Sequence, residues 1–223
     1  MRLVLFDCDG TIVDSQQAII TGMAQAIREA GLTPPPDATI LKSVGLSLEE
    51  AIASYLPDIA PALRNDILAR YRDIAQEIAN REDRGEVLFE GMSELIQTLA
   101  QERDTFLGIV TMKSRRGVKR VCQTHGFTEA FQVLKSADDG PGKPNPQLIF
   151  DAMAELGVAA DQTLMIGDTI YDMAMATNAN VLPIGVSWGY NPIEELQNYG
   201  AQHIVSTAQE LKVLLEQLRV DKT

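Results

Sequence analysis

The chain has 223 residues, of which 45% are hydrophobic and 22% charged, and its formal net charge is −12. This apolar content is sufficient for a buried core, so a mainly disordered chain is excluded. Acidic surfaces repel nucleic acids and anionic membranes, so we expect neither as a partner. The length is typical of one domain, or of one domain with a large insertion.

The cysteine and histidine content limits the compartment and the kinds of metal site. Cys8 and Cys122 are too few for a disulfide framework and are typical of reduced thiols in a cytoplasmic protein. The apolar run Leu3–Phe6 is too short for a signal sequence, and no stretch reaches the ~20 apolar residues that span a bilayer. With only two His and two Cys, zinc is disfavoured, and a metal would be a hard cation bound by oxygen.

Short apolar runs of the kind found in buried strands alternate with helical patterns along most of the chain. Strands are expected at Leu3–Phe6, Phe106–Val110, Phe131–Leu134, Thr163–Ile166, Val181–Val186 and His203–Val205. Several of these runs lack a two-residue alternation of apolar and polar residues, which indicates strands covered on both faces. Strand and helix in alternation predict an α/β fold with a doubly wound parallel sheet.

One long segment interrupts this alternation, because its apolar residues recur only at helical spacing. Within it, Ser47 and Glu50 have the spacing of a capping box, which marks the start of a helix. We therefore predict an all-helical cap inserted after the first strand. The predicted core comprises residues 1–14 and 85–223, and the predicted cap comprises residues 15–84.

Polar side chains follow four of the predicted strands. In open α/β sheets, ligands bind at the carboxyl ends of the strands. The candidate residues at these ends, in chain order, are Asp7, Asp9, Thr11, Thr111, Lys143, Asp168 and Asp172. We expect them to lie together at one edge of the sheet.

Four carboxylates in one place would repel one another, and a divalent cation would remove that repulsion. Mg²⁺ prefers carboxylate and carbonyl oxygens and commonly shares a phosphate oxygen with its substrate. Together with Lys143, the metal would cancel most of the local negative charge. A phosphate ester could then bind to Thr111 and to the backbone N–H groups of the Asp9–Thr11 turn.

Asp7 and Asp9 are two residues apart and can take separate roles in phosphoryl transfer. One carboxylate can attack phosphorus and form an aspartyl-phosphate. The other can protonate the leaving alcohol and then deprotonate the attacking water. The spacing alone does not assign the two roles.

The segment Asp7-Cys8-Asp9-Gly10-Thr11 resembles the DxDxT signature of the haloacid dehalogenase (HAD) superfamily. Thr111, Lys143 and Gly167-Asp168 with Asp172 resemble its second, third and fourth motifs, in the same order. The helical insertion resembles the cap of this superfamily, and Gly185–Tyr190 is similar to its phosphoglycolate-phosphatase-like branch, which is related to the β-phosphoglucomutase-like enzymes. The resemblance covers essentially the whole chain and implies a Rossmann-like HAD core.

The resemblance implies that the first and fourth motifs carry the nucleophile and the metal. Asp7 would be the nucleophile and a metal ligand. Asp9 would be the acid/base and would offer its backbone carbonyl to Mg²⁺. Thr11 would orient the loop. Asp168 would be a further metal ligand, and Asp172 would support the metal shell.

The resemblance also implies how the phosphoryl group is bound. Thr111 and Lys143 would contact it, together with the turn at Asp9 and Gly10, and Lys143 would in addition neutralise the nucleophile. Many members of this branch have Asn or Gly after the Thr of the second motif. Met112 stands there in this chain, and it can offer only its backbone N–H.

We therefore expect a Mg²⁺-dependent phosphoric monoester hydrolase acting on a small phosphorylated metabolite, with phosphoglycolate suggested by the branch, in a monomer or homodimer. Two alternatives stay open. A phosphomutase is disfavoured because Ile19 and Leu48 stand where β-phosphoglucomutase-like members have His and Arg. A non-catalytic, receiver-like phosphate-binding module is disfavoured because receiver domains are shorter than this chain. It is also disfavoured by Asp9, because a stable phosphate sensor needs no acid/base beside the phosphorylated Asp.

Several polar residues near the motifs are expected to be structural. A solvated helix start is expected for Lys113, Arg115 and Arg116. Asp14 and Ser15 are expected to cap the first helix of the insertion. For Trp188 and Tyr190, lining the mouth of the site and packing a loop are equally compatible with the sequence.

Overall fold

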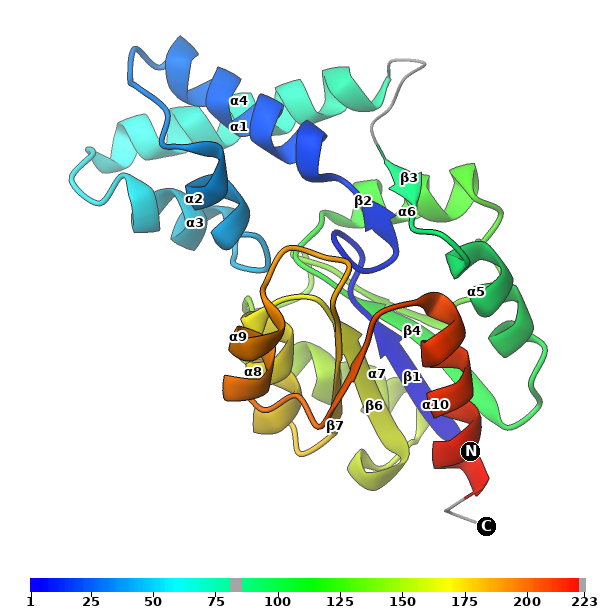
Figure 1. Cartoon of the computed structure of the whole chain (residues 1–223). Coiled ribbons are helices and arrows are strands. Elements are labelled where there is room, and N and C mark those ends of the chain that lie inside the picture. Colours follow the sequence, from blue (N-terminus) through cyan, green and yellow to red (C-terminus); the bar gives the residue numbers. More distant parts are fainter. Residues whose placement is uncertain (81–85, 221–223) are drawn as a thin grey trace.

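The computed structural model describes residues 1–80 and 86–220. Its centre is a six-stranded parallel sheet with the strand order β5-β4-β1-β6-β7-β8. The strands are β1 (Arg2–Phe6), β4 (Thr105–Val110), β5 (Val133–Lys135), β6 (Thr163–Gly167), β7 (Leu182–Val186) and β8 (His203–Val205). The prediction of a doubly wound parallel sheet is confirmed (Figure 1).

Both faces of the sheet are covered, which explains why the strands show no alternation. In β1, Val4 and Phe6 point into one apolar cluster, and Leu3 and Leu5 point into another on the opposite face. The first cluster is covered by α5 (Met92–Ala100), α6 (Arg115–Thr124) and α10 (Ala208–Val220), and the second by α7 (Gln147–Leu156) and α8 (Ile170–Asn178). The short helices η1 (Ala160–Gln162) and α9 (Ile193–Asn198) complete this part of the fold.

The insertion after the first strand consists of four helices that lie beyond the carboxyl ends of the strands (Figure 1). They are α1 (Gln16–Glu29), α2 (Asp37–Lys42), α3 (Leu48–Tyr55) and α4 (Pro61–Ala79). They share an apolar cluster of their own, and the capping box of Ser47 and Glu50 is formed at the start of α3. Within the described residues, none of the helices has the length and apolar character needed to cross a membrane.

The chain passes between the sheet and the helical insertion through a small ribbon that was not predicted. β2 (Val13–Asp14) and β3 (Val87–Leu88) pair in antiparallel orientation at the two ends of the insertion. The predicted end of the cap at Arg84 lies outside the described residues, so the exact division into core and cap stays a prediction.

The strand boundaries differ from the prediction mainly at β5, which begins at Val133 instead of Phe131. Phe131 lies before the strand and packs edge-on against Phe6 and Phe127. An aromatic residue at the end of an apolar run is compatible with either placement, and burial of the Phe131 ring in the first apolar cluster decides between them.

Candidate active site

The register of the sheet brings the strand ends together. Phe6 of β1 lies opposite Ile109 of β4 and opposite Ile166 of β6. Asp7, Thr111 and Asp168 therefore leave the sheet at the same edge, as predicted from the strand ends. All three are buried.

Lys143 joins the first and fourth motifs. Its side chain is fully buried, and its Nζ lies 2.9 Å from Asp7 Oδ1 and 2.6 Å from Asp172 Oδ1. Burial opposes the charged ammonium, but the carboxylates of Asp172 and Asp7 outweigh it and raise the pKa of Lys143. Lys143 therefore remains protonated and offsets part of the charge of these two acids.

Asp168 is held by donors from two other segments. Its Oδ1 accepts a hydrogen bond of 2.9 Å from Thr11 Oγ1, and its Oδ2 accepts one of 2.9 Å from the backbone N–H of Tyr190. Burial, followed by the charges of Asp172 and Asp7, raises the pKa of Asp168 well above its usual range. Thr11 thus fixes the first-motif loop directly to the fourth motif.

The third acid, Asp172, is fixed by the start of its own helix. It forms a capping box with Thr169, whose hydroxyl donates a hydrogen bond of 2.6 Å to Asp172 Oδ2. Its other carboxylate oxygen contacts Lys143. Both oxygens of Asp172 are therefore engaged within the protein, which fits a residue that supports a metal shell.

The three buried acids fit a hard divalent cation. One carboxylate oxygen each from Asp7, Asp168 and Asp172 lies within 4.8 Å of the others. Lys143 supplies a single positive charge against three carboxylates, and burial raises the pKa of Asp7 to about 6 against the lowering effect of that lysine. An all-oxygen donor set with excess negative charge is what Mg²⁺ prefers.

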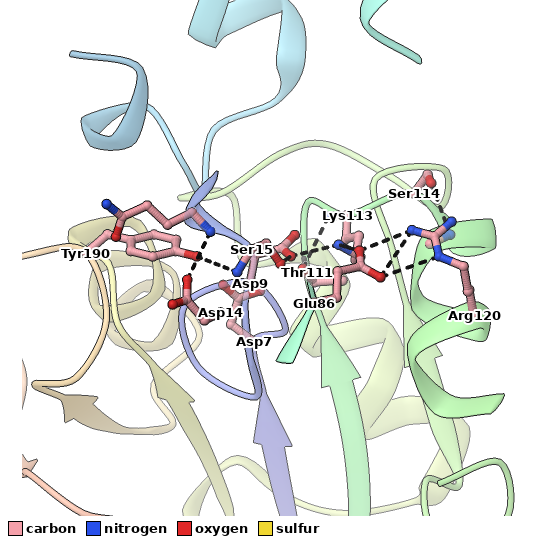
Figure 2. Close-up of polar contacts among 12 residues, drawn as sticks. Asp7, Asp9, Asp14, Ser15, Glu86, Thr111, Lys113, Ser114, Arg120 and Tyr190 are labelled. Carbon is pink, nitrogen blue, oxygen red and sulfur yellow. Dashed lines mark hydrogen bonds and ion pairs between the residues drawn. The ribbon is translucent and has the colours of Figure 1, made fainter. Parts of the chain in front are cut away.

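Asp9 lies apart from this cluster, which corrects the expectation of four acids in one place. Its Oδ1 accepts hydrogen bonds from Ser15 Oγ and from Lys113 Nζ, the latter at 2.7 Å (Figure 2). Its charge is therefore matched by a lysine and does not add to that of the three buried acids. The carboxylate lines the cavity described below.

Lys113 is part of the site, and the prediction that it lies at a solvated helix start is wrong. Its side chain is only 12% exposed, and its Nζ lies 2.8 Å from Glu86, which also pairs with Arg120 (Figure 2). Burial opposes its charge, but Asp9 and Glu86 outweigh that effect and raise the pKa of Lys113. Arg115 also pairs with an acid, Asp139, whereas Arg116 is exposed as expected.

At the N-terminus of α1, Asp14 Oδ1 accepts a hydrogen bond of 3.0 Å from the backbone N–H of Gln16. The side chain of Ser15 makes no capping hydrogen bond and instead donates to Asp9. The backbone N–H of Ser15 donates to the hydroxyl of Tyr190 at 3.1 Å, and Trp188 Nε1 donates to the carbonyl of Thr11 at 3.1 Å. These contacts match the loop-packing alternative for Trp188 and Tyr190, since both hold the first-motif segment in place.

A cavity of about 580 Å³ lies between the strand ends and the helical insertion. From the sheet it is lined by Asp7, Asp9, Thr111, Met112 and Lys113, among others. From the insertion it is lined largely by apolar side chains, including Ile19, Met23, Ile40, Leu48, Tyr71 and Ile78. A ligand in this cavity would therefore face polar groups from the sheet side and a largely apolar wall from the insertion.

A model of the haloacid dehalogenase-like hydrolases matches residues 4–186. The chain belongs to this family. The expectation drawn from the four motifs is thereby confirmed, and the first, second and fourth motifs follow strands that end at the same edge of the sheet.

Similar haloacid dehalogenase-like proteins are named as phosphatases. The "Probable phosphatase IndB" of Dickeya dadantii is 30% identical over 94% of this chain and 91% of that protein. An N-acetylmuramic acid 6-phosphate phosphatase of Pseudomonas aeruginosa is 28% identical (99% and 97% covered), and a phosphoglycolate phosphatase of Vibrio cholerae is 29% identical (89% of each). These relatives confirm the prediction of a phosphoric monoester hydrolase of the phosphoglycolate-phosphatase-like branch.

A solved structure shares the haloacid dehalogenase-like fold over nearly the whole chain. The "Crystal structure of a predicted phosphatase from Clostridium acetobutylicum" superposes with a TM-score of 0.86 at 25% identity, covering 97% of this chain and 98% of that one. The family fold therefore includes the helical insertion as well as the sheet.

Gly10 occupies a place in the first motif that no other residue fits, which leads to a testable prediction. Its φ is +83°, and a Cβ added there would lie 2.2 Å from Asp168 Oδ2. Gly10→Ala is expected to displace the loop and to lower phosphatase turnover about 100-fold, since a misplacement of about 1 Å can have this effect. Gly31→Ala is the matched control, because Gly31 has a similar φ of +78° and open space around it.

The control separates backbone strain from the contact with Asp168. Gly31→Ala should lose about 1 kcal/mol of stability and keep its turnover. Phosphate release and thermal unfolding of both variants provide the measurement. Equal turnover in the two variants would show that the close approach of Gly10 to Asp168 does not matter for the reaction.

Proposed function

We propose that the protein is a Mg²⁺-dependent phosphatase that hydrolyses a small phosphate monoester through an aspartyl-phosphate on Asp7. The observation that carries this proposal is the placement of Asp7, which is buried beside Lys143 and Asp168 and also lines the cavity. In this position a carboxylate can reach a bound phosphoryl group while its own charge is partly offset.

In the first step, a carboxylate oxygen of Asp7 bonds to phosphorus and the ester P–O bond breaks. This step requires Asp9, which pairs with Lys113 in the structure, to be protonated when the ester is bound. Asp9 then gives this proton to the leaving oxygen, which departs as the alcohol. In the second step, Asp9 takes a proton from a water that attacks the phosphoryl group, and phosphate leaves Asp7. Mg²⁺, when bound by Asp7 and Asp168 with support from Asp172, would stabilise the negative charge of the phosphoryl group.

The remaining residues of the site would bind and orient the reacting groups. Thr111 and Lys143, with the backbone N–H groups of Gly10 and Met112, are the proposed contacts of the phosphoryl oxygens. Lys113 and Ser15 hold the carboxylate of Asp9 at the cavity wall. The helical insertion would exclude bulk water from the site when a substrate is bound.

For the substrate we propose only a class, the small phosphate monoesters, and no single compound. The similar proteins named above act, by their names, on different phosphate esters, of which phosphoglycolate is the smallest candidate for this chain. The phosphomutase alternative is weakened by Ile19 and Leu48, which face the cavity as apolar side chains. The alternative of a non-catalytic module is weakened by Asp9, which lines the cavity beside the proposed nucleophile.

A panel of phosphate esters with and without metal tests this function. The protein is expected to release inorganic phosphate from several small esters with Mg²⁺ present, and to lose essentially all turnover in excess EDTA. Addition of Mg²⁺ should restore it. With a hexose 1-phosphate, the expected product is free phosphate. Formation of the hexose 6-phosphate with little free phosphate would instead establish a mutase, and a long-lived phosphoprotein without release would establish a binding module.

A further inference from the structure

Two arginines that pair with no residue the structure describes line the cavity of the candidate active site. Arg72 belongs to α4 of the insertion and Arg116 to α6 on the sheet, and both line the cavity that also contains Asp7 and Thr111. Both are exposed to solvent. Neither makes a hydrogen bond or an ion pair with any residue that the structure describes.

Among the described residues, three neighbouring cations are engaged with acids, which sets these two arginines apart from them. The ion pairs around them are Lys113 with Asp9 and Glu86, Arg120 with Glu86, and Arg115 with Asp139. In a chain with a net charge of −12, acids are plentiful, so two guanidinium groups in one cavity that pair with none of the described acids stand out. An anionic group of a ligand is the partner that such an arrangement can bind, because guanidinium matches carboxylate and phosphate oxygens.

The positive charge continues from the cavity into an adjoining groove along α6. Gln76 and Arg116 line both hollows, and Gln76 lies one helical turn from Arg72 on α4. The charged residues that line the groove are Arg115, Arg116, Lys119, Arg120 and Asp138. Asp138 is occupied by the backbone N–H of Arg115. The field at this end of the cavity therefore favours anions.

The cavity is larger than a phosphoryl group alone requires. A volume of about 580 Å³ lies in the range that holds a drug-sized ligand, which is much larger than a phosphoryl group. The same cavity is also lined by apolar side chains such as Ile19, Leu48 and Ile78. A ligand that fills the cavity would therefore carry an apolar part as well as its phosphoryl group.

We propose that Arg72 and Arg116 bind a second anionic group of the substrate, so that the preferred substrates are phosphate monoesters with an apolar body and a distal carboxylate or phosphate. This inference rests on the proposed function for the assignment of the other end of the cavity to the transferred phosphoryl group. Arg72 belongs to the insertion and Arg116 to α6, a helix that covers the sheet. The distal anion would therefore also hold these two parts together.

The test uses phosphonates, which bind like phosphate esters but have no ester bond to hydrolyse. Calorimetric titration with Mg²⁺ compares ω-phosphonoalkanoic acids of increasing chain length with alkylphosphonic acids of the same length. At the best length, the carboxylated ligand is expected to bind about tenfold more tightly than the alkylphosphonic acid of the same length. This difference in affinity is at the low end for hydrogen bonds between charged groups, because both arginines are exposed to solvent. A series of α,ω-bisphosphonic acids shows whether a distal phosphate binds better than a carboxylate.

Variants assign the preference to the two arginines. Arg72→Gln and Arg116→Gln should each lose most of the tenfold preference and bind the alkylphosphonic acids as the wild type does. Arg28→Gln is the matched control, because Arg28 is an exposed arginine of α1 that does not line the cavity. Raising the salt concentration should reduce the preference in the wild type.

Two results would overturn the inference. One is equal binding of carboxylated and plain ligands at every chain length, and the other is a preference that both variants retain in full. Failure of the proposed function would look different. In that case no phosphate ester would be hydrolysed, while the comparison of phosphonate affinities would remain measurable.

Discussion

Asp7→Asn is expected to lower the turnover of every phosphate ester by roughly 10⁴-fold or more, the scale seen when a catalytic nucleophile is removed. Asn has the shape of Asp but a neutral, weakly nucleophilic amide, so the attack on phosphorus fails while the fold remains. Steady-state phosphate release with an aryl phosphate and Mg²⁺ provides the measurement. Asp14→Asn is the control, because Asp14 is an exposed residue of the same segment that does not line the cavity.

The same experiment separates the roles of Asp7 and Asp9. Asp9→Asn should still be phosphorylated by an aryl phosphate, whose leaving group departs without a proton, but should release phosphate slowly because no base activates the water. Mass spectrometry of the quenched variant is expected to find one phosphoryl group on the peptide that contains Asp7. Turnover of Asp7→Asn at the wild-type rate, or a phosphoryl group elsewhere in Asp9→Asn, would contradict the mechanism.

Lys143→Met is expected to have the largest effect on stability. Met has a volume close to that of Lys but no charge, so Asp7 and Asp172 lose the ammonium that lies between them. Removing one partner from a buried ion pair typically costs about 3–5 kcal/mol. The unfolding free energy from urea denaturation should fall by this amount without metal, and saturating Mg²⁺ should restore part of it, since a cation would again offset the carboxylates.

Lys135→Met is the matched control for this change. Lys135 pairs with Glu155, whose side chain is 51% exposed, and such surface ion pairs contribute at most about 1 kcal/mol. Activity gives a second comparison, because Lys143→Met should lose turnover as well as stability. If the two lysine variants were equally stable with and without Mg²⁺, the buried ion pairs of Lys143 would have no special energetic role.

The sheet and the helical insertion were predictable because their sequence patterns are strong and local. Runs such as Leu3–Phe6 are apolar throughout, as expected for a short strand that is covered on both faces. The capping box at Ser47 marks the start of a helix. The ribbon of β2 and β3 was not predictable, because two residues per strand are too few to show a period. Phe131 was misplaced because ring packing, which a single sequence does not reveal, decides its position.

The candidate site was predicted to the extent that its residues follow strands. Asp7, Thr111 and Asp168 come directly after β1, β4 and β6, and a rule about strand ends is enough to find them. Lys113 lies three residues after the end of β4, so it also follows a strand end. Its role was missed because its partners Asp9 and Glu86 lie at the two ends of a long insertion. Contacts between segments so distant in the sequence leave no local pattern.

The pairing of β2 with β3 has a consequence for how this chain can vary. Val13 lies opposite Leu88 and Asp14 opposite Val87, so the chain leaves the sheet and returns to it at adjacent residues. The two ends of the insertion are therefore held together whatever lies between them, and the entropy of closing a loop depends only slowly on its length. Helices can lengthen, shorten or be exchanged beyond this ribbon without moving a strand. One continuous segment that lines the cavity can thus be replaced, while the proposed catalytic residues at the strand ends keep their positions.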